Sequence, residues 1–229
     1  MAPRVLSILV LFLGLVAATA RAELIVSVTD ATLTPGGSAV VDVLVAGDGV
    51  AALDLFSIVV RLEGVPGGRR LVFVAPGPGS QTDGQLSDPS YLFAGDSVFA
   101  GGIAGTLADE PNPSDTYIGG DGTLSGSGVL VPMTPTLLTR LQLTGSMADT
   151  PIIGDRFRVV VDLLDARSSF LDAALDPIPI RFAGPGIVSV VPEPSGLALL
   201  SAGLAAVGLA ARREARVRRP APDRSRLRS

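Results

Sequence analysis

Residues 23–190 predict an all-β fold, a two-sheet sandwich, because three features of the sequence agree. Short runs alternate apolar with polar residues, Gly, Pro and Asp separate the runs, and no stretch between 23 and 185 has convincing helical periodicity. Alternation with a period of two places one face of a strand in a core and the other in solvent. About nine such runs are expected to pack as two sheets, in a jelly-roll or immunoglobulin-like arrangement.

The expected strands follow one another along the whole of this region. They are residues 24–28, 38–46, 53–62, 71–74, 91–96, 137–143, 157–163, 178–182 and 187–191. The first is followed by the turn Thr34-Pro35-Gly36-Gly37, where Pro before Gly suits a type II turn. In the third, Phe56 and Ile58 face one side while Ser57 faces the other. Segment 91–96 is expected to close an edge of the sandwich, and 169–175 is the nearest candidate for a helix.

Segment 100–128 is dense in Gly, Asp, Ser and Pro and is expected to be a long loop. Loops of this length are usually functional or disordered. Calcium takes oxygen ligands from acidic clusters, and the candidate ligands here are Asp96, Asp109, Glu110, Asp115 and Asp121. No EF-hand loop or Gly-Gly-x-Gly-x-Asp repeat is present. A solvated loop without metal is therefore the leading interpretation and a calcium site the alternative; no other cofactor is expected.

The N-terminus predicts a secretory signal peptide over residues 1–22. Arg4 precedes an apolar run at 5–16, and small residues then offer cleavage after Ala20 or Ala22. Cleavage after Ala22 leaves Glu23 as the first mature residue. An uncleaved N-terminal anchor is the alternative, but so short a run is poor for spanning about 30 Å of hydrocarbon.

The C-terminus carries three features in a fixed order: a Pro-Glu-Pro motif, an apolar run and a basic cluster. Residues 191–219 contain them, and a tail at 220–229 follows. The motif is Pro192, Glu193 and Pro194, the predicted transmembrane helix is 195–211, and the cluster is Arg212, Arg213, Arg216, Arg218 and Arg219. At 1.5 Å per residue the helix is about 25 Å long, near the lower limit for a membrane span. Arginines at its cytoplasmic end act as a stop-transfer signal. A buried helix of a soluble domain is the alternative.

Charge divides the chain in the same way. Residues 23–191 hold eight Arg against nineteen Asp plus Glu, a net charge of −11, whereas 212–229 hold eight Arg against two acidic residues, a net charge of +6. The acidic region would repel nucleic acid, and the basic tail lies beyond the predicted span. Both ends thus predict that 23–191 is exported and that the tail stays in the cytoplasm.

Cys, His, Lys and Trp are all absent from the sequence. Cys nucleophiles, Ser-His-Asp triads, lysine Schiff bases and Cys/His zinc sites are therefore excluded. Only carboxylate chemistry would remain for an enzyme, with Asp162 and Asp165 as a candidate glycosidase pair. Without disulfides, the domain depends on its hydrophobic core.

The C-terminal motif, span and Arg cluster resemble the PEP-CTERM sorting signal of bacterial envelope proteins. The resemblance implies that a membrane transpeptidase, exosortase, recognises Pro192, Glu193 and Pro194 and detaches the outer domain from its anchor. A proline locks φ and favours extended geometry in the residue before it. Such a segment stays outside the membrane helix, where an enzyme can bind it. The alternative is that the two prolines only mark the start of a helix.

The outer domain resembles the cohesin-like domains of PEP-CTERM proteins. The matching segments are 33–37, 40–43, 91–97, 154–157 and the closing strand that runs into 191–194. The leading expectation is a non-catalytic structural or adhesive protein, exported through the secretion machinery, anchored in the inner membrane as a precursor and then sorted to the cell surface or extracellular matrix. The alternative is a permanently anchored binding module for a dockerin-like protein or a polysaccharide. The lack of Trp counts against a sugar.

Overall fold

The computed structural model of the protein describes residues 23–64, 70–74, 85–98, 106–107, 115–146, 150–193, 201 and 204. The predicted signal peptide at 1–22, the Arg cluster at 212–219 and the tail at 220–229 lie outside these residues. Of the predicted membrane helix only Ser201 and Leu204 are described, and both are helical. Within the described part of the chain, no helix is long and apolar enough to span a bilayer. The predicted span therefore stays a prediction.

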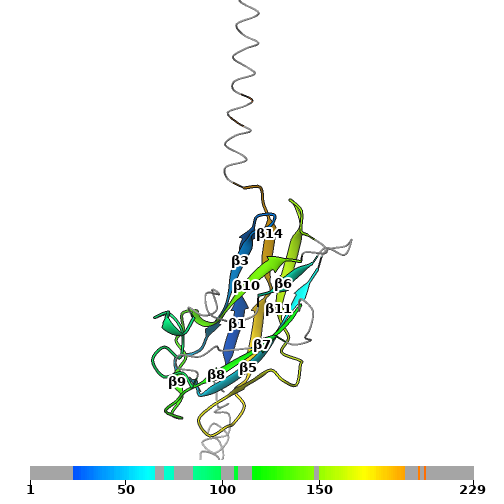
Figure 1. Ribbon diagram of the computed structural model, residues 1–229. Helices are drawn as coiled ribbons and strands as arrows, with labels where there is room; N and C mark the ends of the chain where they lie inside the picture. The colour runs from blue at the N-terminus through cyan, green and yellow to red at the C-terminus, as the bar shows by residue number, and fades with distance from the viewer. Residues whose placement is uncertain are drawn as a thin grey trace, which may run out of the picture.

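The chain forms two β-sheets that enclose one core, as predicted (Figure 1). In spatial order the first sheet contains β13 (Ile180–Gly184), β1 (Leu24–Val28), β3 (Ser38–Ala46), β10 (Thr136–Gly145) and β6 (Leu71–Phe73). The second contains β2 (Ala31–Leu33), β14 (Gly186–Val190), β11 (Arg156–Val161), β5 (Leu55–Glu63), β8 (Thr116–Gly122) and β7 (Thr106–Leu107). The smaller elements are β12 (Ser169–Leu171), which pairs with β5, the pair β4 (Ala52–Leu53) and β9 (Val129–Leu130), and the 3-10 helix η1 (Gln85–Ser87).

Alternation of side chains explains most of these strands. In β3 every second residue is buried, from Ala39 to Val45, and the residues between them are only half-buried. In β11, Phe157 and Val159 are buried while Arg156 and Arg158 are exposed. A strand with one apolar face must cover it with a second layer. The predicted strands at 24–28 and 38–46 are confirmed at the same bounds.

Both ends of the folded chain cross from one sheet to the other. β1 continues into β2, and β13 continues into β14. The crossing strands pair in parallel, β1 with β13 in the first sheet and β2 with β14 in the second. Gly186 lies at the second crossing, where a Cβ atom would be 2.4 Å from the carbonyl oxygen of Thr29. The described chain enters the sandwich at one end and leaves it, after β14, at the opposite end (Figure 1).

The core is built from aliphatic residues around a group of aromatic rings. Phe56 stacks on Phe93 with ring centroids 5.8 Å apart, and Phe170 packs against Phe56 at 6.1 Å. All three rings are almost completely buried. Burying such a side chain contributes roughly 1.5–3 kcal/mol. Since the chain has no cysteine, this packing supplies stability that small exported domains often obtain from disulfides.

Residues 85–98 close one side of the sandwich, as expected for 91–96, but 91–96 consists of turns and is not the strand that was expected. Tyr91 forms a parallel bridge to Leu137 of the first sheet, and Ser97 forms an antiparallel bridge to Thr123, directly after β8 of the second sheet. Between these bridges the backbone turns, and Phe93 points into the core with no exposed surface. The segment therefore joins the two sheets along one edge.

The expectation for segment 100–128 was wrong. Segment 100–128, expected to be a loop, contains β8, which pairs with β5 over seven residues from Thr116 to Gly122. Its glycines reflect close packing, since a Cβ atom at Gly119 would lie 2.4 Å from the ring of Tyr117. Segment 169–175, the nearest helix candidate, is β12 followed by a turn.

Replacing Gly186 by Ala should lower the free energy of unfolding by about 1–3 kcal/mol, because the new methyl group meets the Thr29 backbone at the sheet crossing. Urea denaturation measures the change. Ser189→Ala, on the half-buried face of the same strand, is the control and should stay within about 0.5 kcal/mol of the parent. Equal stability of the two variants would contradict this description of the crossing.

Candidate functional site

The predicted sorting motif begins where the sandwich ends. The Val190 N–H donates to the carbonyl oxygen of Asp155 at 2.9 Å, and the Val191 N–H donates to that of Leu33 at 2.8 Å. Pro192 has no N–H to donate, and Glu193 is exposed. Pro194 lies outside the described residues. Among the residues that the structure describes, the last main-chain bond to the domain is thus one residue before the motif.

A hydrogen-bonded turn at 150–155 lies beside this exit. We name turns 34–37 and 150–155, together with residues 191–193, the exit pole. The Asp155 carboxylate accepts the N–H of Ile152 at 2.9 Å, and Gly154, with φ +96°, donates to the carbonyl oxygen of Val190 at 3.0 Å. The turn presents Ile152 and Ile153, which are 54% and 57% exposed. Two adjacent isoleucines therefore face outward next to the departing chain.

The opposite end, the distal pole, consists of residues 47–54, 123–133 and 172–176. It carries the exposed side chains of Val50, Leu130 and Met133. The backbones that carry them are joined, since Ala52 pairs with Leu130 and Gly47 donates to the carbonyl oxygen of Pro132. The three exposed side chains therefore lie on neighbouring segments of the backbone.

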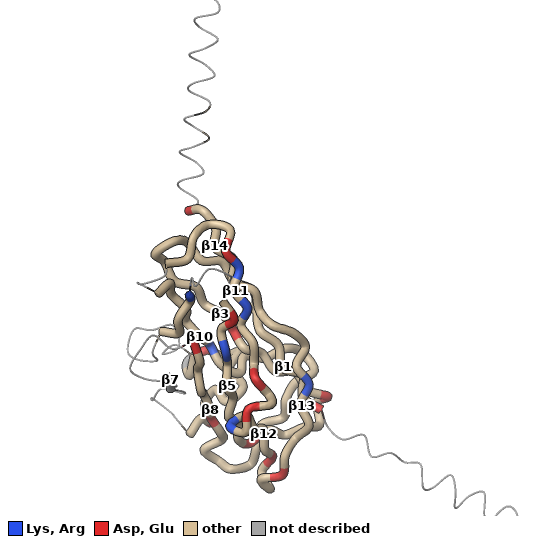
Figure 2. The backbone as a smooth tube through the Cα atoms, turned by 90° about the vertical axis from the view of Figure 1, so that its right-hand side faces the viewer, with Lys and Arg blue, Asp and Glu red and all other residues tan. Residues whose placement is uncertain are grey.

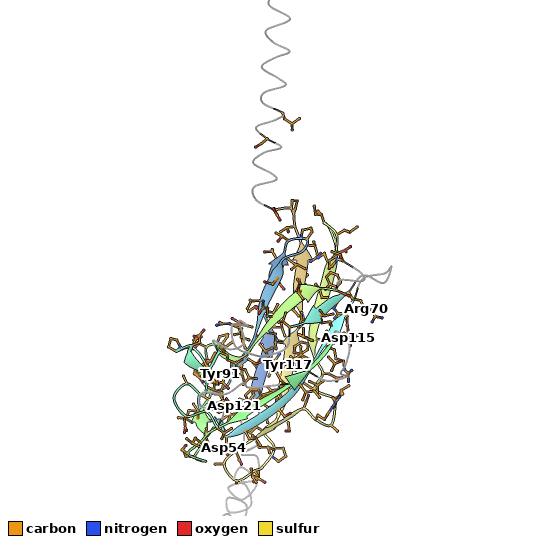
Figure 3. The ribbon with its side chains drawn as sticks, in the orientation of Figure 1. Asp54, Arg70, Tyr91, Asp115, Tyr117 and Asp121 are labelled. Atoms are coloured by element: carbon orange, nitrogen blue, oxygen red, sulfur yellow. The ribbon has the colours of Figure 1, made fainter. Side chains whose placement is uncertain are left out.

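Asp121, one of the predicted calcium ligands, is buried and bound by protein donors. Its side chain is 1% exposed and accepts hydrogen bonds from the Tyr91 hydroxyl, the Ser97 hydroxyl at 2.6 Å and the N–H of Gly122 at 2.7 Å. Figure 3 shows Tyr91 and Asp121 near each other in the lower half of the sandwich. Burial, followed by the bond to Asp121, raises the pKa of Tyr91. This contact fastens segment 85–98 to β8.

The other predicted calcium ligands do not gather around Asp121. Asp96 accepts the N–H of Ser125 at 3.0 Å and its hydroxyl at 2.6 Å, which fixes the turn after β8. Asp115 precedes β8, six residues from Asp121, which is about 20 Å along a strand. These two residues therefore do not share one ion. Asp109 and Glu110 lie outside the described residues. Among the side chains that are described, no group of three or more acidic residues is arranged to hold a metal.

An ion-pair centre at Arg140 joins two strands of the first sheet to segment 85–98. The guanidinium group donates to both carboxylate oxygens of Asp42, at 2.8 and 3.0 Å, and to Asp88 at 2.8 Å. Bonds from Ser90, and then from Arg140, lower the pKa of Asp88 to about 2. The carboxylates raise the pKa of Arg140. Arg140 and Asp42 form a bidentate pair, a geometry that holds two strands together. The ion-pair centre therefore has a structural role.

Asp162 and Asp165, the candidate catalytic pair, are also held by arginine. Arg61 donates to Asp162 at 2.8 Å and to Asp165 at 3.0 Å. The bond from Arg61 lowers the pKa of Asp162, and bonds from Arg167 lower the pKa of Asp165. A glycosidase needs one carboxyl group whose pKa is raised so that it can act as an acid. Both groups are shifted in the opposite direction, so the geometry does not fit this chemistry.

Several solved structures are similar to this chain, and they are cohesins. The sixth cohesin of scaffoldin B from Acetivibrio cellulolyticus, in complex with a Cel5 dockerin, has 15% identity and a TM-score of 0.46, covering 73% of this chain and 99% of that one. The OlpC cohesin of Clostridium thermocellum, also in a dockerin complex, has 12% identity and a TM-score of 0.48, covering 76% and 95%. A non-cellulosomal cohesin from the archaeon Archaeoglobus fulgidus has 9% identity and a TM-score of 0.45, covering 76% and 95%.

These similarities concern the fold alone, because the identities are so low. No protein-family model matches the chain, and no curated protein matches it. The two-sheet sandwich itself is established by the strand order and the shared core.

Tyr91→Phe should lower the free energy of unfolding by about 1–3 kcal/mol, because it removes a donor from the buried Asp121 carboxylate. Tyr117→Phe is the matched control. Its hydroxyl is bonded to Thr139, a neutral partner, so the expected loss is smaller, about 0.5–1.5 kcal/mol. Chemical denaturation compares the two, and a larger loss for Tyr117→Phe would contradict the assigned role of Asp121.

Acid should destabilise the domain as the pH falls from about 5 to about 2. Asp88, Asp162 and Asp165 have folded-state pKa values below the unfolded value of about 3.9, so their contribution is complete above that value and is lost as they become protonated. Denaturation midpoints measured across this range should fall less steeply for Asp88→Asn than for the parent. Parallel curves would show that Asp88 does not contribute.

Proposed function

We propose that the chain is an exported, non-catalytic envelope protein whose β-sandwich is displayed outside the inner membrane and sorted through Pro192, Glu193 and Pro194. The observation that carries the proposal is the order of motif, apolar run and Arg cluster directly after the last strand of the domain. The position of the motif supports it, because the last described hydrogen bond to the sandwich is made by Val191.

Removal of everything after the motif would leave the sandwich intact. β14 ends at Val190, and its partners β2 and β11 lie upstream in the sequence. An exosortase that binds the extended motif and cuts near Pro194 would release a complete domain to the surface or matrix. Cleavage of the predicted signal peptide before Glu23 would also remove no strand, because Glu23 directly precedes β1.

The surroundings of the carboxylates, like the composition, favour a domain without catalysis. The pKa values of the candidate pair Asp162 and Asp165 are lowered by arginine. Asp121 is buried and bound by hydroxyl groups. These carboxylates are engaged in contacts that stabilise the fold. This favours a domain that acts through its surface and not through a catalytic carboxylate.

A binding module for a protein partner is the second candidate, favoured by the exposed Val50, Leu130 and Met133 of the distal pole. An apolar group on the surface, surrounded by polar residues, is typical of a protein contact. A dockerin-like partner is the kind expected for a cohesin-like domain. In this case the module stays anchored, so it keeps residues 195–229.

Intact-mass measurement and membrane fractionation distinguish the two functions. In cells that contain an exosortase, the mature form should begin near Glu23 and end near Pro194. The variant Pro192→Ala/Glu193→Ala/Pro194→Ala should keep residues 195–229 and stay in the membrane, because the enzyme no longer recognises it.

The tail provides a matched control that also replaces two prolines and one acidic residue, Pro220→Ala/Pro222→Ala/Asp223→Ala. This variant should be processed like the parent. If the parent itself keeps residues 195–229, the motif marks only the start of a helix and the sorting proposal is wrong.

A further inference from the structure

The exit pole has an apolar tip that is fixed to the departing chain. Ile152 and Ile153 are more than half exposed, and hydrogen bonds between Ile152 and Asp155 close the turn that holds them. Gly154 donates to the carbonyl oxygen of Val190, and Val190 donates to that of Asp155. The tip and the last residue of β14 therefore move together.

The same tip must lie close to the predicted membrane span. Val191 is still bonded to the sandwich, and the apolar run starts at Ser195. Four residue steps reach at most about 14 Å when fully extended. With the predicted span in a bilayer, the exit pole would lie within about this distance of the membrane surface.

The two turns of the exit pole carry little exposed charge. In turns 34–37 and 150–155 the only ionisable residue is Asp155, which is 7% exposed, whereas Glu193 in the departing chain is an exposed carboxylate. Arg156 follows it, is exposed and forms no ion pair with any residue in the described part of the chain. Most described Asp and Glu residues lie in the half of the sandwich farther from the exit (Figure 2). An exposed arginine can pair with the phosphate group of a lipid.

We propose that, in the anchored protein, the exit pole docks on the outer surface of the inner membrane, with Ile152 and Ile153 inserted among the lipid headgroups and Arg156 near their phosphates. The inference rests on the proposed function, since it requires the span at 195–211. Two isoleucines alone would bind lipid weakly. The adjacent span makes their contact intramolecular, so the effective concentration of lipid is high.

The chain contains no tryptophan, which makes a single reporter available. The full-length Ile153→Trp variant is reconstituted into vesicles of phosphatidylcholine and phosphatidylglycerol, and its emission is recorded with and without brominated lipid. Met133→Trp, at the distal pole and 76% exposed in the parent, is the matched control. Flotation of the vesicles measures anchoring separately.

The expected result is that both variants float with the vesicles, while only the Ile153→Trp emission shifts to shorter wavelength and is quenched by brominated lipid. Flotation with equal, water-like emission from both variants overturns the docking inference and leaves the anchor intact. Failure to float overturns the anchor and the docking together. If the Ile153→Trp emission shifts in native membranes but not in the vesicles, the tip contacts a protein, and the lipid inference is wrong.

Discussion

The parallel pairing of the two chain ends is the constraint on which the rest of the structure depends. β1 lies beside β13 in one sheet, and β2 lies beside β14 in the other. The N-terminal and C-terminal strands thus complete each other, and β14 is an interior strand between β2 and β11. Residues up to Val190 are required for the fold. A cut near Pro194 removes no strand, whereas a cut before Gly186 would remove β14 from the middle of its sheet.

Polar interactions then fix the position of segment 85–98, which hydrophobic burial alone would not specify. Arg140 joins β10 to β3 and to segment 85–98, and Asp121 joins the same segment to β8. The hydrophobic effect is non-directional, but these bonds specify how segment 85–98 closes one side of the sandwich. They also engage carboxylates that composition alone would leave available for catalysis or metal binding. What remains outward is an apolar tip at the exit pole and exposed apolar side chains at the distal pole, which suits a displayed domain.

Strands with strict alternation could be predicted from the sequence, as β3 and β11 show, because burial on one face leaves a period of two. β8 could not be, since Gly119 and Gly120 give no alternation signal. Gly119 makes room for the ring of Tyr117 in the same strand, and Gly120 lies against the backbone of Phe56, which is remote in sequence. The partners of Arg140 were hidden for the same reason: Asp42 lies 98 residues away. Of the predicted sites, Pro192 and Glu193 lie just beyond the last strand, whereas the calcium candidates Asp115 and Asp121 are separated by the length of β8. Side-chain spacing along a chain does not show which residues meet across a sheet.

Amide hydrogen exchange along residues 186–193 of the full-length protein tests the central claim most directly. The claim is that the folded domain ends at Val191 and that the motif begins outside it. The amides of Val190 and Val191, bonded to Asp155 and Leu33, should be protected together with β14, whereas that of Glu193 should exchange rapidly. Protection that continues through Glu193 would place the motif inside the fold, where an exosortase could not bind it, and would contradict this account.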